Sequence, residues 1–150
     1  MEHTVVLADA KTVERSDQRE ILEAAGASIR LLDEKTEAAV VEAVQGADAI
    51  IVDAATPVTA RAIAATDTLR VVGRSGIGVD NIDVGAAAEN GVTVVNVPDY
   101  ALDEVSTHAL SLLLSCVRAV PRYDRAVRDG TWDWTTGRPI ERFSSGTLGL

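Results

Sequence analysis

Short apolar runs alternate with amphipathic segments through the first hundred residues. Each run is continuously apolar and rich in valine and isoleucine, which is typical of strands buried on both faces of a parallel sheet. Each intervening segment has the apolar spacing of a helix. The pattern predicts an α/β fold with a parallel five-stranded, flavodoxin-like sheet in the order 2-1-3-4-5. The predicted strands are residues 4–8, 28–32, 49–52, 69–72 and 92–97.

Polar residues and glycines mark where the predicted helices begin and end. A hydroxyl or carboxylate side chain at the N-cap satisfies a free backbone N–H, and a glycine just beyond the last turn adopts the left-handed conformation that closes a helix. We expect Ile21, Leu22 and Ala25 to share the inward face of the first helix. The expected caps are Ser16 or Thr12, then Thr36, Thr59 and Asp83, and the expected closing glycines are Gly26, Gly46 and Gly91.

The pattern changes after Pro98. Residues 103–120 form a predicted helix with apolar positions on nearly every side, which must be buried all round, and Asp103 is its expected cap. Pro121 either kinks this helix or begins another that stops at Gly130. Residues 147–150 resemble the opening of a strand. The expected domains are residues 1–98 and residues 99–150.

Composition narrows the class of protein. Hydrophobic residues make up 47% and charged residues 25%, as in an ordinary globular chain. A net charge of −9 argues against a nucleic-acid partner, because phosphates would be repelled. The single cysteine, Cys116, allows no intrachain disulfide and no metal cluster. With no readable signal peptide or membrane span, we expect a cytoplasmic protein with no membrane partner and no metal.

A glycine-rich stretch, residues 73–78, follows the fourth predicted strand. In an open α/β sheet, ligands bind where loops leave the carboxyl ends of the strands. Glycines there let backbone N–H groups approach a ligand that a Cβ would push away, which makes Gly76 and Gly78 the first candidates. Taken alone, a Gly-X-Gly after a strand is most often only a tight turn.

Three segments carry a resemblance to a known family: SGIGVDNIDVGAAAENGVTVVNVPDY, DEVSTHALSLLL and RAVRDGTWDW. Together they resemble the amino-terminal half of the NAD-dependent D-isomer-specific 2-hydroxyacid dehydrogenases. The similarity is nearest to the branch of phosphoglycerate dehydrogenases and C-terminal-binding-protein corepressors. The resemblance implies a substrate domain at residues 1–98. It also implies a hinge helix and the first helices of an incomplete Rossmann domain at residues 99–150.

The resemblance also implies an activity. The protein would transfer a hydride between NAD, with NADP as an alternative, and a small D-2-hydroxy or 2-oxo acid, and it would form a homodimer. Backbone amides of Ser75, Gly76 and Ile77 would bind the substrate carboxylate, and Ile77 and Val105 would border the nicotinamide. The family's catalytic arginine, glutamate and histidine and its Gly-X-Gly-X-X-Gly motif lie beyond the position of Leu150. We therefore assign no catalytic residue and expect the chain alone to be inactive.

Several nearby residues are expected to have structural roles. Asp80 and Asn81 would shape the glycine turn through hydrogen bonds to the backbone. His108 lies within an apolar helix and would be a core or hinge residue. Asp53 departs from relatives that act on phosphorylated substrates, which often have serine or arginine there. Its charge would repel a phosphate, which argues against phosphoglycerate as the substrate.

Two other functions remain open. A non-catalytic, NAD(H)-sensing, corepressor-like binding protein would share the same family features. A phospho-accepting receiver domain has the same fold, with acidic residues at the positions of Asp9 and Asp53. That reading is weak, because Ala10 replaces a second acidic residue and no lysine follows the fifth predicted strand.

Overall fold

The computed structural model describes residues 3–8 and 17–149. The chain divides into two compact units, residues 1–100 and residues 101–150. Each unit is described here by itself.

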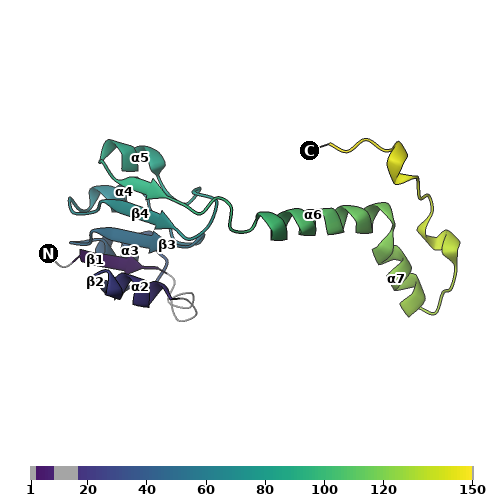
Figure 1. Cartoon of the computed structure of the whole chain (residues 1–150), viewed down its shortest axis with the longest axis horizontal. Helices are drawn as coiled ribbons and strands as arrows, with labels where there is room; N and C mark the ends of the chain where they lie inside the picture. Colours follow the sequence, from purple (N-terminus) through teal and green to yellow (C-terminus); the bar gives the residue numbers. More distant parts are fainter. Residues whose placement is uncertain (1–2, 9–16, 150) are drawn as a thin grey trace. The chain divides into compact units, whose positions relative to one another are not determined.

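A five-stranded parallel sheet forms the centre of the first unit (Figure 1). Its strand order, β2-β1-β3-β4-β5, confirms the order expected from the sequence. The register places Val6 beside Ile50 and Ile50 beside Val72 across the middle of the sheet. The strands are β1 (His3–Leu7), β2 (Ala27–Leu31), β3 (Ala49–Val52), β4 (Val71–Arg74) and β5 (Thr93–Val95).

Helices connect the strands, and three of their predicted caps are confirmed. The side chains of Thr36, Thr59 and Asp83 accept hydrogen bonds from backbone N–H groups in the first turn, at 3.2, 3.3 and 2.9 Å respectively. The closing glycines Gly26, Gly46 and Gly91 have φ values of 83°, 68° and 67°, in the left-handed region. Ser16 and Thr12 lie outside the described residues. The helices are α2 (Gln18–Ala24), α3 (Glu37–Ala43), α4 (Ala60–Ala64) and α5 (Val84–Glu89).

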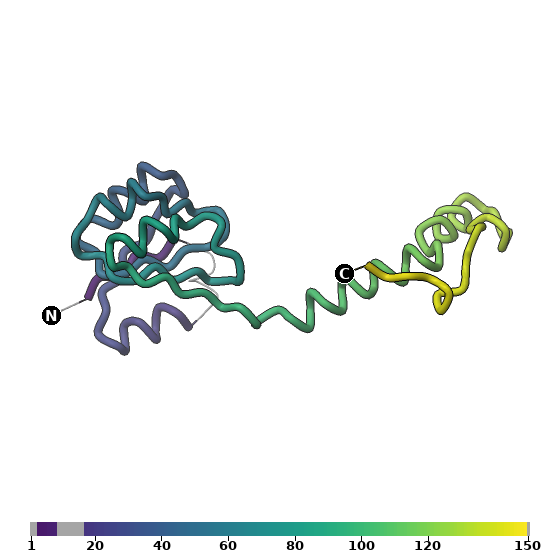
Figure 2. Tube along the Cα trace, turned by 90° about the horizontal axis from the view of Figure 1, so that it is seen from above, coloured from purple at the N-terminus to yellow at the C-terminus, as the bar shows by residue number. Residues whose placement is uncertain are grey.

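Among the described residues, the hydrophobic core has many more buried side chains on one face of the sheet than on the other. Figure 2 shows helices on both sides of the sheet. The larger cluster joins alternate strand residues such as Ile50 and Val72 to Val40 of α3 and Ile63 of α4. The smaller cluster contains buried Val5 and Leu7, with Leu22 of α2 and residues such as Ile29 and Ile51 packed against them. In the part of the chain that the structure describes, the second face therefore has fewer buried contacts than the first.

Three details of the sequence reading are wrong. Gly73 and Arg74 belong to β4 rather than to the turn, because Gly73 pairs with Ile51 on one side and Val95 on the other. The sheet ladder therefore continues two residues past the apolar run. Ile21 does not face inward, since its side chain is 65% exposed and Leu22 makes the contact with the core. The fifth strand is shorter than expected, covering Thr93–Val95.

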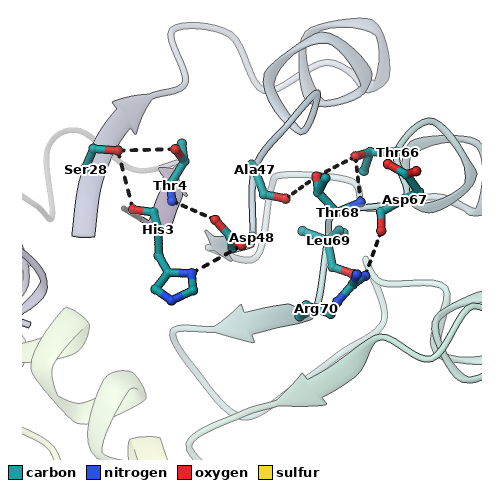
Figure 3. Close-up of polar contacts among 10 residues, drawn as sticks. All are labelled: His3, Thr4, Ser28, Ala47, Asp48, Thr66, Asp67, Thr68, Leu69 and Arg70. Atoms are coloured by element: carbon teal, nitrogen blue, oxygen red, sulfur yellow. Dashed lines mark hydrogen bonds and ion pairs between the residues drawn. The ribbon is translucent and has the colours of Figure 1, made fainter. Parts of the chain in front are cut away.

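Asp48 ties three strands together at the amino edge of the sheet, opposite the carboxyl ends (Figure 3). Its carboxylate accepts a hydrogen bond from the Thr4 backbone N–H at 2.8 Å and lies 3.3 Å from His3 Nδ1. Its backbone carbonyl accepts from the Arg70 N–H at 2.8 Å. Asp48 thus links the start of β3 to both neighbouring strands.

The second unit consists of helices and irregular segments. Helix α6 begins after Ala101, which makes no side-chain cap, and Asp103 lies in its first turn, so the expected Asp103 cap is wrong. Ala119 has φ 54°, and Pro121 lies in the first turn of α7, which settles the two roles left open for that proline. Residues 147–149 form no strand. The elements are α6 (Leu102–Val117), α7 (Val120–Arg128), and the 3-10 helices η1 (Trp134–Gly137) and η2 (Phe143–Ser145).

Helix α6 carries no buried residue, and Val105 and Leu110 are more than half exposed. Among the described residues of the second unit, nothing buries the apolar faces of α6 that the sequence marks for burial. Over the part of the chain that the structure describes, no helix combines the length and apolar character needed to cross a membrane.

Candidate functional site

Two loops meet where β3 and β4 reach the carboxyl edge of the sheet. The Ser75 N–H and hydroxyl both donate to the Val52 carbonyl, at 2.9 and 3.0 Å. The Asn81 side-chain amide donates to the carbonyls of Asp53 and Thr56, at 2.9 and 2.5 Å. The loop after β3 and the loop after β4 are thus held together. Asn81 bonds to the backbone, as expected, but it joins the two loops and does not bond within the glycine turn.

The glycine loop itself comprises residues 75–78 and is anchored from both sides. The Gly76 carbonyl accepts from the Val97 N–H at 2.9 Å, and the Ile77 carbonyl accepts from the Asn96 side chain at 2.7 Å. These bonds join the loop to the segment that follows β5. The loop is therefore preorganised, as a binding site on a rigid scaffold requires.

The backbone N–H groups of this loop differ in whether they already donate a hydrogen bond within the protein. The Ser75 N–H donates to Val52, and the Gly76 N–H donates to the Arg74 carbonyl at 2.8 Å. Among the described residues, the Ile77 N–H donates to no backbone carbonyl. Three backbone amides are expected to bind a carboxylate. Of these, the Ile77 N–H is available to donate a hydrogen bond to a ligand in this conformation.

Arg74 is a feature of the site that the sequence reading missed. Its guanidinium lies over Gly76, because a Cβ on residue 76 would be 1.9 Å from Arg74 Nη1. Arg74 Nε is buried and has no hydrogen-bond partner among the described residues. An unsatisfied donor of this kind costs about 1–3 kcal/mol, which an anionic ligand would offset. The signal in the sequence was a charged residue directly before the glycine turn.

Asp53 lies at the end of β3 and is fully engaged by its surroundings. Its carboxylate accepts from the N–H groups of Ala55 and Thr56, each at 3.1 Å, and from the Thr56 hydroxyl at 2.8 Å. It also forms an ion pair with Lys35. Burial opposes ionisation, but the hydrogen bonds from Lys35, Thr56 and Ala55 outweigh it and hold the pKa of Asp53 below its ordinary value. Asp53 is therefore a charged, paired residue that shapes its loop.

The predicted site residues lie in two different units. Ser75 is exposed, Gly76 is buried and Ile77 is 42% exposed, all in the glycine loop of the first unit. Val105 lies on α6 in the second unit and is 62% exposed. Its predicted position beside the nicotinamide stays a prediction. His108 also lies on α6 and is exposed within this chain, so the core position expected for it is not seen.

The described residues give little support for a metal-binding site or for a phospho-accepting aspartate. Within residues 3–8 and 17–149, no group of three or more His, Cys, Asp or Glu side chains could hold a metal ion. Asp9 lies outside the described residues. The Asp53 carboxylate, which a receiver domain would phosphorylate, is occupied by Lys35 and Thr56.

Sequence comparison with known proteins points to the same family as the motifs described above. Residues 5–147 match the model of the family described as D-isomer specific 2-hydroxyacid dehydrogenase, catalytic domain. The chain is 39% identical over 124 residues to D-3-phosphoglycerate dehydrogenase of Mycobacterium tuberculosis, covering 81% of this chain and 24% of that protein. It is 38% identical over 103 residues to hydroxypyruvate reductase of Thermotoga maritima, covering 69% of this chain and 33% of that protein. The chain thus spans about a quarter to a third of the length of these relatives.

Solved structures show the same similarity. NAD⁺-bound 3-phosphoglycerate dehydrogenase of Entamoeba histolytica matches with a TM-score of 0.67 and 25% identity, covering 79% of this chain and 40% of that one. NAD-dependent formate dehydrogenase of Staphylococcus aureus matches with a TM-score of 0.74 and 22% identity, covering 92% of this chain and 45% of that one. The second likeness is evidence of the fold alone.

Proposed function

This chain belongs to the D-isomer specific 2-hydroxyacid dehydrogenase family, and on that premise we propose that it supplies the substrate-binding part of an NAD-dependent oxidoreductase. The reaction is hydride transfer between the nicotinamide and the C2 atom of a small D-2-hydroxy or 2-oxo acid. NAD is the proposed cofactor, with NADP as the alternative. One observation carries the proposal: an arginine with an unsatisfied buried donor lies over a rigid glycine loop at the carboxyl edge of the sheet.

In the proposed complex, the substrate carboxylate lies against the Arg74 guanidinium and the Ile77 N–H. A charge-assisted hydrogen bond from arginine to a carboxylate is about twice as strong as a neutral one, so Arg74 supplies most of the affinity. The loop's hydrogen bonds to Val97 and Asn96 fix where the carboxylate binds. Fixing the carboxylate fixes the neighbouring C2 atom, and this is positioning rather than chemistry.

The cofactor supplies the hydride or accepts it. The residues of this chain fit a nicotinamide nearby, because the Ile77 side chain is apolar and 42% exposed beside the carboxylate site. An apolar surface there would pack against the ring and exclude water. We propose Ile77 for this contact, together with Val105.

The proposed substrate carries no phosphate. Asp53 adds negative charge at the edge of the site, although its pairing with Lys35 reduces the repulsion that a phosphate would meet. Hydroxypyruvate and glyoxylate satisfy the carboxylate requirement without a second anionic group. These small 2-oxo acids are the substrates we propose to test first.

Oligomeric state and location complete the proposal. The exposed apolar residues of α6 favour a homodimer, because soluble monomers rarely leave large apolar patches in water. A chain with one cysteine suits the reducing cytoplasm. The net charge of −9 speaks against direct nucleic-acid binding.

Calorimetric titration tests the proposal. The 150-residue chain should bind hydroxypyruvate and glyoxylate, and Arg74→Gln should weaken that binding at least about tenfold. Glycolaldehyde, which is hydroxypyruvate without the carboxylate, is the matched control ligand and should not bind. Arg61→Gln is the matched control variant, since Arg61 is exposed on α4 and pairs with Glu37. Equal affinity in the wild-type and Arg74→Gln chains would contradict the proposal.

A further inference from the structure

The second unit contains a hollow surrounded by arginines. It has a volume of about 500 Å³, within the range of small-molecule sites. Glu141 is the acidic residue in its lining. The arginines and the larger uncharged side chains around it are Arg118, Arg138, Arg142, Tyr123, Trp134 and Ile140.

Hydrogen bonds hold the walls of this hollow in place. The Tyr123 hydroxyl donates to the Trp134 carbonyl at 2.6 Å, which ties α7 to η1. The Arg122 guanidinium donates to the Arg138 carbonyl at 3.1 Å. Gly137 is buried beneath the Tyr123 ring, since a Cβ on residue 137 would lie 2.3 Å from Tyr123 Cζ. The segment after α7 is thus fixed against that helix, and the hollow is part of the fold of this unit.

The arginines that line the hollow form no ion pair among the described residues, although Asp133 is close enough to Arg138 to interact with its charge. Among the described residues, Arg118, Arg138 and Arg142 form no ion pair within 4.0 Å, whereas Arg128 at the end of α7 pairs with Asp124 at 2.9 Å. The Arg138 guanidinium lies 3.9 Å from the centroid of the Trp134 ring. Stacking of this kind orients an arginine while leaving its N–H groups free to donate.

We propose that this hollow is a binding site for a small dianion, such as a phosphate monoester or a dicarboxylate. The lining holds three guanidinium groups and one carboxylate, and this excess of positive charge favours an anionic ligand. Guanidinium groups present paired donors that match the oxygens of phosphate and carboxylate. Ile140 and the Tyr123 ring provide apolar surface for the carbon part of such a ligand.

This site is separate from the glycine loop and does not depend on the proposed function. All of its residues lie in the second unit, whereas Arg74 and Gly76 lie in the first. The ligand class is defined by charge and size.

Tryptophan fluorescence can report this site directly. The chain has two tryptophans, and Trp134 lines the hollow while Trp132 does not. The Trp132→Phe chain therefore has one reporter, which is titrated with inorganic phosphate, O-phosphoserine and malate at constant ionic strength set by sodium chloride. We expect saturable fluorescence changes. The relative affinities for O-phosphoserine and malate then distinguish a phosphate ester from a dicarboxylate.

Charge-neutralising variants localise the binding. In the Trp132→Phe background, Arg142→Gln and Arg118→Gln should each weaken binding at least about fivefold, as expected for loss of a charge-assisted hydrogen bond. Arg128→Gln removes the same charge from the same unit without touching the hollow, and it should leave the affinity unchanged. Arg74→Gln should also have no effect, which separates this site from the glycine loop. Far-ultraviolet circular dichroism confirms that each variant is folded.

Three results would overturn the proposal. The first is a linear, non-saturating response that sodium chloride reproduces. The second is an equal loss of affinity in Arg142→Gln and Arg128→Gln, which would indicate a diffuse effect of net charge. The third is retention of full affinity by folded Arg118→Gln and Arg142→Gln chains.

Discussion

Arg74 and Gly76 lie against each other at the carboxyl end of β4. A substitution at either residue is therefore expected to alter the packing of the other. The guanidinium lies where a side chain on residue 76 would begin. The contact with Arg74 gives a second reason for a glycine at this position. The glycine makes room for a charged group, in addition to allowing a ligand to approach the backbone.

Gly76→Ala tests this pairing. The added methyl group should displace the Arg74 guanidinium, which is the flexible end of a long side chain, so the fold should survive. Binding of hydroxypyruvate to the chain should weaken about tenfold or more, as for loss of a charge-assisted hydrogen bond. Isothermal calorimetry measures the affinity.

Gly73→Ala is the matched control for Gly76→Ala. A Cβ on residue 73 would lie 3.5 Å from Ile51 Cγ1, which is an ordinary van der Waals contact. This variant should bind with wild-type affinity. If both alanine variants bind as tightly as the wild type, Gly76 does not shape the site.

Asp48 makes a second residue-scale prediction, which concerns stability and pH. The hydrogen bond from the Thr4 N–H and then that from His3 lower the pKa of Asp48 below its ordinary value of 3.8. A carboxyl group with a lowered pKa in the folded state stabilises the fold above pH 3.8, and that stabilisation disappears as the pH falls through the folded-state pKa. Asp48→Ala should therefore be less stable than the wild type near neutral pH, and the difference should shrink in acid.

Urea denaturation at a series of pH values between about 7 and 3 measures this effect. Asp67→Ala is the control, because Asp67 lies in the same region but contributes its backbone carbonyl rather than its carboxylate (Figure 3). Its free energy of unfolding should follow that of the wild type across the series. A constant difference between wild type and Asp48→Ala at every pH would show that the Asp48 charge is irrelevant.

At the scale of the secondary-structure elements, much of the first unit could be predicted from sequence. Continuous apolar runs identified all five strands, and polar caps such as Thr36 and Thr59 identified where helices begin. These signals are local, so a linear pattern contains them. The end of β4 could not be found this way, because Gly73 joins the strand through pairing with Ile51 and Val95, which are distant in sequence.

The candidate site was only partly predictable for the same reason. The glycine loop was visible as a motif, but which of its amides are already bonded depends on Val52 and Val97. Arg74 was hidden because its importance comes from a three-dimensional contact with Gly76 and a buried Nε. Lys35 was likewise missed, since its pairing with Asp53 crosses from one loop to another.

Helix α6 gives the prediction at this scale. Its exposed apolar residues, including Leu110, Leu112 and Leu114, form an apolar surface of the kind that soluble monomers rarely leave in contact with water. We expect the 150-residue chain to self-associate through α6. Sedimentation velocity at several concentrations should show a concentration-dependent increase in mass. Leu110→Glu and Leu113→Glu should shift the chain toward monomer.

Ser111→Glu is the control for these α6 variants. It adds the same charge to the helix beside Leu110 but replaces an exposed polar side chain. It should associate like the wild type. A wild-type chain that sediments as a monomer at all concentrations would contradict the prediction.

At the scale of the whole molecule, binding and chemistry are separable. The carboxylate site proposed in the first unit would orient the substrate without exchanging a proton with the C2 oxygen. Hydride transfer to a 2-oxo acid also requires a proton donor near that oxygen. We assign no such residue in this chain.

The 150-residue chain should therefore bind 2-oxo acids without reducing them. Absorbance at the NADH band, followed with hydroxypyruvate and with glyoxylate, should change no faster than in the absence of protein. Hydroxypyruvate reductase of Thermotoga maritima, a relative named for one of these substrates, serves as the positive control for the assay. Reduction above the background rate would mean that a catalytic group is present within residues 1–150.

The most direct test of the carboxylate site is a nuclear magnetic resonance titration of the ¹⁵N-labelled chain with hydroxypyruvate. Shifts should concentrate on the Ile77 and Gly78 amides and on the Arg74 Nε–H signal, and they should saturate. The second unit should remain unchanged, and Arg74→Gln should abolish the saturable shifts while keeping the spectrum of a folded chain. No shift in the glycine loop, or the same saturating shifts in Arg74→Gln, would contradict the assignment of Arg74 and this loop as the substrate-binding site.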